Sequence, residues 1–215
     1  MSRMSAVFRK VFGAVLVAAL LANPAAAQTT GTPAVAKIEA FYATLVDSMR
    51  RGSSLGVRGR YQLLAPVVDA TFDIPTMIKF IVGPNWTTMS ESDHKALIDA
   101  FRRMTIANYA SNFDSFHGEK FTVDPGALSK GADLFVQSNL VSDSGKPTPF
   151  NYRMRQNSNG GWKVIDIFLN GYVSELATRR SDYAATLASG GASALVTKLN
   201  ALADNQLIGG KTSGG

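Results

Sequence analysis

The sequence predicts an α+β domain in which helices pack on one side of a curved, mostly antiparallel sheet of four strands. Two observations lead to this prediction. Apolar residues recur at helical spacing through the first half of the chain, and the spacing then changes to that of strands before two more helices close it. The breaks between the strands are short, and short breaks favour antiparallel neighbours.

The first 27 of the 215 residues are predicted to be a secretory signal peptide. Three basic residues come before an apolar run of 12 residues (11–22), which is too short to span a bilayer. Three alanines at 25–27 then fit the small-residue rule for cleavage before Gln28. We therefore expect an exported protein, with an N-terminal anchor helix as the alternative.

The remaining 188 residues of the 215 are enough for one domain with its own core, predicted at 28–208 and followed by a flexible tail at 209–215. The signal segment holds three of the 22 Lys and Arg and none of the 16 Asp and Glu, so the rest carries a net charge of +3. This charge does not predict a nucleic-acid partner, but it allows transient contact with an anionic membrane surface.

The predicted helices are recognised by their ends as well as by their spacing. Thr32 followed by Pro33 is a typical helix start, as is the run of capping residues at 90–93, and Asp73 is suited to cap a short helix that begins near a proline. The helices are expected at 33–49, around 61–68 with an interruption near Pro66, at 74–82, and from Ser90 to about His117.

The second half of the chain has the composition of strands. Segments rich in β-branched and aromatic residues are separated by breaks at 125–126, 144–147 and 157–161. The strands are expected at 120–124, 134–142, 150–156 and 162–169, followed by helices at 174–188 and 192–204 on either side of Gly190-Gly191.

Asp166 conflicts with its surroundings, because the strand 162–169 is otherwise suited to a sheet packed on both faces. A carboxylate there costs several kcal/mol unless a partner compensates it. One interpretation is a general base in an enzyme acting on an apolar substrate. The other is a structural role, in which Asp166 accepts backbone hydrogen bonds or pairs with an arginine such as Arg180 or Arg153.

The sequence offers little for catalysis. There is no Cys, and the two His have no metal-ligand spacing, so we expect no disulfide, no zinc site and no cofactor. The phosphate-loop-like stretch at 210–212 has Asn205 where that motif needs a glycine. The number of large apolar residues, in contrast, indicates a surplus over what one sheet layer needs, and this surplus suggests an apolar pocket between sheet and helices.

Six segments together resemble the MlaC family of periplasmic lipid-binding proteins, in order and in spacing, over about residues 35–204. Gly171, Ser174 and the run from Arg180 to Tyr183 are closer to the hopanoid-associated HpnM branch, and this leaves the cargo open between phospholipid and hopanoid. The six segments are FDIPTMIKFIVGPNW, AFRRMTIANYASNF, GEKFTV, NYRM, GWKVIDIFLNG and RRSDYAATLASGGASALVTKL.

The resemblance implies a soluble periplasmic carrier that is not an enzyme. Such a carrier holds acyl chains in a pocket and passes lipid between an outer-membrane lipoprotein complex and an inner-membrane ABC transporter complex. It also implies a structural role for Asp166. The alternatives are an enzyme acting on an apolar envelope substrate and an envelope adaptor without cargo.

The expected pocket wall comes from apolar helix and strand faces within the matching segments. Ordinary core is the competing interpretation for each member. Two of them, Val164 and Ile167, point to opposite faces of a regular strand, so both can line a pocket only if the sheet curls. The predicted wall residues are Ile81, Trp86, Phe101, Met104, Tyr109, Phe113, Val136, Tyr152, Met154, Val164 and Ile167.

Overall fold

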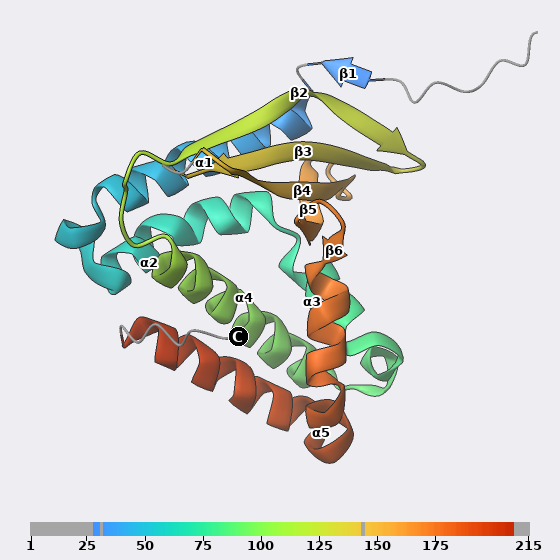
Figure 1. The fold of residues 1–215 in the computed structure, drawn as a ribbon. Coiled ribbons are helices and arrows are strands. Elements are labelled where there is room, and N and C mark those ends of the chain that lie inside the picture. The colour runs from blue at the N-terminus through green and yellow to red at the C-terminus, as the bar shows by residue number, and fades with distance from the viewer. Residues whose placement is uncertain (1–27, 31, 143–144, 209–215) are drawn as a thin grey trace, which may run out of the picture.

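The computed structural model describes residues 28–30, 32–142 and 145–208. The predicted signal peptide (1–27) and tail (209–215) lie outside the described residues. Helices cover one face of an antiparallel sheet (Figure 1), which confirms the α+β class. None of the helices in the described ranges has both the length and the hydropathy that a membrane span requires.

The sheet has six strands rather than the predicted four, and their spatial order follows the chain. The two additional strands lie at the edges and are three and two residues long. Segments this short cannot show the alternation by which strands are recognised. The strands are β1 (Gln28–Thr30), β2 (Lys120–Lys130), β3 (Asp133–Val141), β4 (Pro147–Gln156), β5 (Trp162–Leu169) and β6 (Val173–Ser174).

The predicted break at Pro125-Gly126 is wrong, because β2 continues through it. The register of β2 against β3 shifts between Val123 and Ala127, so the strand accommodates the proline in an irregularity. The hairpin turn comes later, at Gly131, whose φ of 63° is in the left-handed region that glycine adopts without cost.

The helices begin where the capping residues predict. Thr32 accepts a hydrogen bond from the amide of Val35, Asp73 accepts one from Thr76, and Ser90 forms a reciprocal capping box. The helices are α1 (Pro33–Arg50), α2 (Gly52–Thr71), α3 (Ile74–Val82), the 3-10 helix η1 (Gly83–Thr88), α4 (Glu91–Asn112) and α5 (Glu175–Leu207).

Helix α2 is longer than predicted, because Gly52 begins a helical segment directly after α1, and this segment is separated from the rest of α2 by a kink at Gly56, whose dihedral angles are not helical. A Cβ atom at Gly52 would lie 1.9 Å from the carbonyl oxygen of Asp114, so only glycine fits at this corner. Helix α5 bends at Gly190 and Gly191, which have non-helical dihedral angles, and this agrees with the two helices predicted there. Its second half runs back beside α4 (Figure 1).

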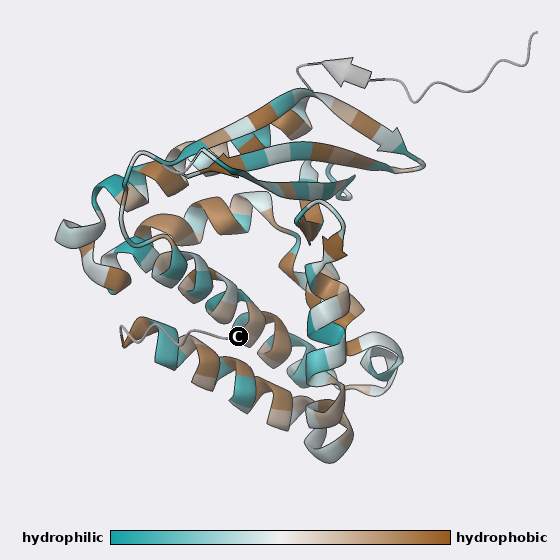
Figure 2. Ribbon diagram, viewed as in Figure 1, coloured by the Kyte–Doolittle hydropathy of each residue, from teal (hydrophilic) through white to brown (hydrophobic). Residues whose placement is uncertain are grey.

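The core lies between the inner face of the sheet and the helices, where apolar segments of both layers face each other (Figure 2). Helix α1 contributes Ile38, Phe41 and Leu45, all fully buried against the sheet. Each buried side chain of this size contributes about 1.5–3 kcal/mol to folding. This layer also fixes the positions of the strands that form the site described below.

An irregularity in β5 explains how Val164 and Ile167 both face inward. Arg153 pairs with Asp166, whereas the next residue, Met154, pairs with Val164, so Ile165 is extra on the β5 side. Such a bulge resets the alternation of side chains. Val164 packs in the core and Ile167 packs against it, although a regular strand would place them on opposite faces.

Candidate ligand-binding cavity

A cavity of about 300 Å³ lies between the inner face of the sheet and the helices. Helices α1, α3, α4 and α5 and strands β2, β4 and β5 all contribute to its lining, most of which is apolar or aromatic. The lining residues are Tyr42, Leu45, Phe72, Met77, Phe101, Thr105, Asn108, Tyr109, Asn112, Phe113, Phe121, Phe150, Tyr152, Ile167, Leu169, Glu175, Leu176 and Arg179.

Aromatic rings form a continuous wall of this cavity. Tyr42 stacks on Phe121 with 4.3 Å between ring centroids and meets Tyr152 edge-on at 5.9 Å. Phe113 lies between Tyr109 and Phe121, at 5.9 and 6.0 Å. These separations are within the range of favourable aromatic pairs, so rings from α1, α4 and the sheet hold one another in place.

The hydroxyl groups in the wall remain neutral. Ser138 donates to the carbonyl oxygen of Phe150, so Tyr42 donates to Ser138 across 2.7 Å. Burial raises the pKa of Tyr42 to about 12. Burial likewise raises the pKa of Tyr109 and of Tyr152. None of these phenols is therefore suited to transfer protons near neutral pH.

Polar side chains are confined to two helices. Thr105, Asn108 and Asn112 follow one another along one face of α4, at the three- to four-residue spacing of a helix. Glu175 and Arg179 occupy the same relation on α5. These residues are half-buried or exposed, as are some apolar lining residues such as Phe113, whereas Tyr42 and Leu45 are buried, so the polar group lies in the more exposed part of the lining and forms its polar rim.

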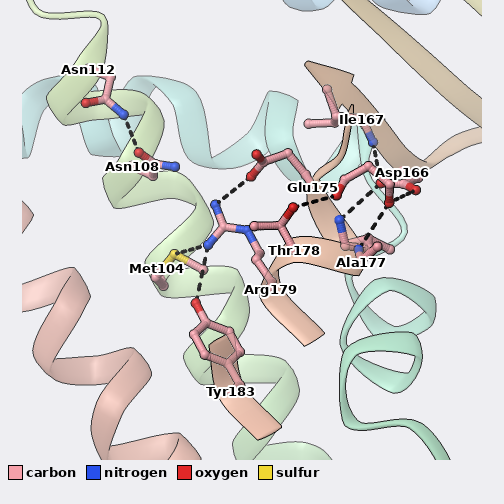
Figure 3. A network of polar contacts seen from close by, with 12 residues as sticks. Met104, Asn108, Asn112, Asp166, Ile167, Glu175, Ala177, Thr178, Arg179 and Tyr183 are labelled. Atoms are coloured by element: carbon pink, nitrogen blue, oxygen red, sulfur yellow. Dashed lines mark hydrogen bonds and ion pairs between the residues drawn. The ribbon is translucent and has the colours of Figure 1, made fainter. Parts of the chain in front are cut away.

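Arg179 is the centre of the rim (Figure 3). Its Nη2 lies 3.2 Å from Oε2 of Glu175, and each side chain is 23% exposed. Its Nη1 donates to the hydroxyl of Tyr183 at 3.3 Å and lies 3.8 Å from the sulfur of Met104. On the facing helix, the amide of Asn112 donates to Asn108. The guanidinium is thus held from three sides beside the cavity.

Of the predicted wall residues, Phe101, Tyr109, Phe113, Tyr152 and Ile167 line the cavity. Ile81, Val136, Met154 and Val164 are instead fully buried in the core and do not line it. The alternation of a strand or the face of a helix identifies inward residues, but it does not distinguish those beside a void from those beside other side chains.

Trp86 and Met104 also lie outside the lining, for different reasons. Trp86 is in η1, where its ring stacks on His94 with 4.0 Å between centroids and its carbonyl oxygen contacts the imidazole. Met104 is buried behind Arg179, whose guanidinium covers its sulfur. Both predictions rested on apolar spacing, which gave no sign of these polar neighbours.

The lining also contains residues that the sequence-based prediction missed. Tyr42 and Leu45 lie on the helical face of α1 that was recognised as apolar, and Phe121 and Phe150 lie on predicted strands. Their apolar spacing was therefore a usable signal. The polar rim gave none, because Asn108 and Arg179 look like ordinary solvent-facing helix residues in a sequence.

Asp166 connects β5 to the start of α5. Its Oδ1 accepts from the amides of Ile167 at 2.8 Å and Leu176 at 3.3 Å, and its Oδ2 accepts from the hydroxyl of Ser174 at 2.6 Å (Figure 3). Ser174 in turn caps α5 by accepting from the amide of Ala177. Of the two structural alternatives, backbone hydrogen bonding is therefore the one observed.

The predicted arginine partner of Asp166 is wrong. Arg153 is opposite Asp166 in the strand register, but its guanidinium forms an ion pair with Asp133 of β3 at 2.5 Å, and Arg180 lies over the ring of Phe80 at 5.7 Å. Asp166 is also outside the cavity lining, so it is not placed to act on a bound molecule. Within the described ranges, no group of three or more His, Cys, Asp or Glu is arranged to hold a metal ion.

Fold and cavity together define an α+β protein with an internal site for an apolar ligand and a polar rim. Residues 39–201 match the family model described as MlaC protein. The chain therefore belongs to the MlaC family. Its fold is also similar to that of a phospholipid-binding protein from Ralstonia solanacearum solved in complex with a phospholipid, with a TM-score of 0.69, 20% identity, and coverage of 80% of this chain and 98% of that one.

Proposed function

We propose that this protein is a lipid carrier that holds the acyl chains of a phospholipid in the cavity. The observation that carries the proposal is the cavity itself, a space of about 300 Å³ with an aromatic and aliphatic wall and a polar rim on one side. Family membership and the fold shared with a phospholipid-binding protein support it. Phospholipid is the preferred cargo, and a hopanoid is the alternative.

The physical demand on a carrier matches this lining. Exposing a methylene group to water costs about 0.8 kcal/mol. The transfer of two chains of about 16 carbons from a membrane into water therefore costs on the order of 20 kcal/mol. A carrier must therefore supply an environment about as apolar as the bilayer. The volume is at the lower end of the roughly 300–1,000 Å³ range of ligand pockets, and the polar rim gives the headgroup a place near solvent.

The proposal extends to location and partners. Export by the predicted signal peptide puts the carrier in the periplasm, where it shuttles lipid between an outer-membrane lipoprotein complex and an inner-membrane ABC transporter complex, with transient contact to membrane surfaces. We propose that it is not an enzyme, because Asp166 lies outside the lining and the tyrosine hydroxyls in it stay protonated. A cavity of this kind also favours a carrier over an adaptor without cargo.

Two neighbours on β5 provide a matched test. Ile167 lines the cavity, whereas Phe168 lies on the opposite face of the sheet beside Phe135. Ile167→Trp should fill the cavity and lower lipid uptake from phospholipid vesicles about tenfold, since overfilling costs about 1–3 kcal/mol. Phe168→Trp should leave uptake unchanged.

The readout is lipid per protein after gel filtration, with the melting temperature of both variants as the folding control. Equal uptake by wild type, Ile167→Trp and Phe168→Trp would show that the lipid binds elsewhere. No uptake by wild type would contradict the carrier function itself.

A further inference from the structure

The cavity lining contains two charged side chains, Glu175 and Arg179, and they neutralise each other. Both come from the first two turns of α5, and both are partly buried at 23% exposure. A partly buried site opposes any uncompensated charge, because the charge has lost part of its hydration. The rim is therefore electrically neutral and polar at the same time.

Each member of the pair keeps capacity for a ligand. In the part of the chain that the structure describes, the contacts of Arg179 involve Nη1 and Nη2, which leaves the Nε hydrogen available. Glu175 uses Oε2 toward Arg179, which leaves Oε1 as an acceptor. A guanidinium edge is suited to a phosphate oxygen, and a carboxylate oxygen is suited to an ammonium group.

The start of α5 is not the phosphate contact. Anions are commonly held by free amides at a helix N-terminus. Here the amide of Leu176 donates to Asp166 and that of Ala177 donates to Ser174. The side chain of Arg179 is thus the donor that this rim offers to a headgroup.

We propose that Glu175 and Arg179 form a headgroup site that prefers a zwitterionic headgroup, carrying one phosphate and one ammonium, over a purely anionic one. A phosphoethanolamine headgroup places its phosphate on Arg179 and its ammonium on Glu175, and the rim stays neutral. A phosphoglycerol headgroup adds one negative charge beside Glu175 that nothing in the lining compensates. Asn108 and Asn112, on the facing helix, add uncharged hydrogen-bonding groups.

This inference rests on the proposed lipid-carrier function, so its test separates the two. Delipidated protein is mixed with vesicles containing equal amounts of phosphatidylethanolamine, phosphatidylglycerol and diacylglycerol with identical acyl chains. The lipids bound to the re-isolated protein are then measured by mass spectrometry. Wild type should take up phosphatidylethanolamine over phosphatidylglycerol by about tenfold, the scale of one charge-assisted hydrogen bond.

Two substitutions should change this ratio in different ways. Glu175→Gln leaves the rim positive and should shift the preference toward phosphatidylglycerol. Arg179→Gln leaves the rim negative and should lower the uptake of both phospholipids relative to the uptake of diacylglycerol. The control is Arg51→Gln, which removes a similar ion pair, Arg51 with Asp47 at 3.1 Å, away from the cavity lining.

The possible results test the carrier function and the headgroup site separately. Absence of every lipid, diacylglycerol included, contradicts the carrier function. Uptake of lipid without a preference in wild type, or a preference that Glu175→Gln leaves unchanged, overturns the headgroup site while the carrier function stands. If Arg179→Gln does not fold, the headgroup site is still tested by two measurements. These are the ratio of bound phosphatidylethanolamine to phosphatidylglycerol in wild type and the direction in which Glu175→Gln changes this ratio.

Discussion

The hydrogen bonds of Asp166 lead to the most quantitative stability prediction. Asp166→Ala removes the acceptor of the amides of Ile167 and Leu176 and of the Ser174 hydroxyl. Asp166 as a residue is 6% exposed, so water cannot readily replace its carboxylate. The hydroxyl can rotate to another acceptor, but the two amides cannot.

Each buried donor left without an acceptor costs about 1–3 kcal/mol. Two amides therefore predict a loss of about 2–6 kcal/mol in the free energy of unfolding. For a domain of this size each kcal/mol lowers the melting temperature by about 2–4 °C, so a loss near 3 kcal/mol corresponds to about 6–12 °C. Part of this loss should appear as fraying of the first turn of α5, which Ser174 caps.

Urea unfolding followed by circular dichroism measures this loss. Asp166→Asn is the informative comparison, because its Oδ1 still accepts from both amides and its loss should be about half that of alanine. Asp99→Ala, at an exposed ion pair with Lys95, is the control and should change stability by about 0.5 kcal/mol or less. An Asp166→Ala protein within about 1 kcal/mol of wild type would refute the structural role.

Two further predictions concern other polar contacts. Arg60 is buried and donates to the carbonyl oxygens of Ala110 and Gly52, both at 2.7 Å, so Arg60→Met should destabilise by about 2–4 kcal/mol in urea unfolding, and an unchanged midpoint would contradict this. Burial alone would raise the pKa of Asp133, but hydrogen bonds from Arg155 and Arg153 outweigh it and hold that pKa below its ordinary value. The stability that this carboxylate contributes is thus present above its unfolded pKa and lost as pH falls through the lower folded value. The difference in unfolding free energy between wild type and Asp133→Asn should be smaller at about pH 3 than at about pH 6, and a larger difference in acid would show the sign to be wrong.

Much of the fold could be predicted because it depends on local signals. The caps at Thr32, Asp73 and Ser90 fix three helix starts, and Gly190-Gly191 fixes the bend of α5. The continuation of β2 through Pro125 could not be predicted, since it depends on pairing with β3. Tertiary contacts override local turn signals in such cases.

The site could be predicted only in part. Periodicity identifies side chains that point inward, and Phe101, Tyr109 and Ile167 were found in this way. Periodicity cannot show which of these side chains lie beside a cavity. It therefore predicts Val136 as a wall residue, although Val136 is fully buried in the core. The bulge that turns Ile167 inward is a property of the pairing of β4 with β5 and has no sequence signal of its own.

The proposed function requires that the cavity hold the acyl chains of a lipid. The most direct test is to purify the protein, denature it and measure the lipid in the organic extract by mass spectrometry. If the protein is a lipid carrier, the extract of the wild type should contain close to one phospholipid, or one hopanoid if that is the cargo, per protein molecule. The extract of Ile167→Trp should contain much less lipid per protein. Repeated absence of stoichiometric lipid from wild-type protein that also takes up none from vesicles would contradict the carrier function.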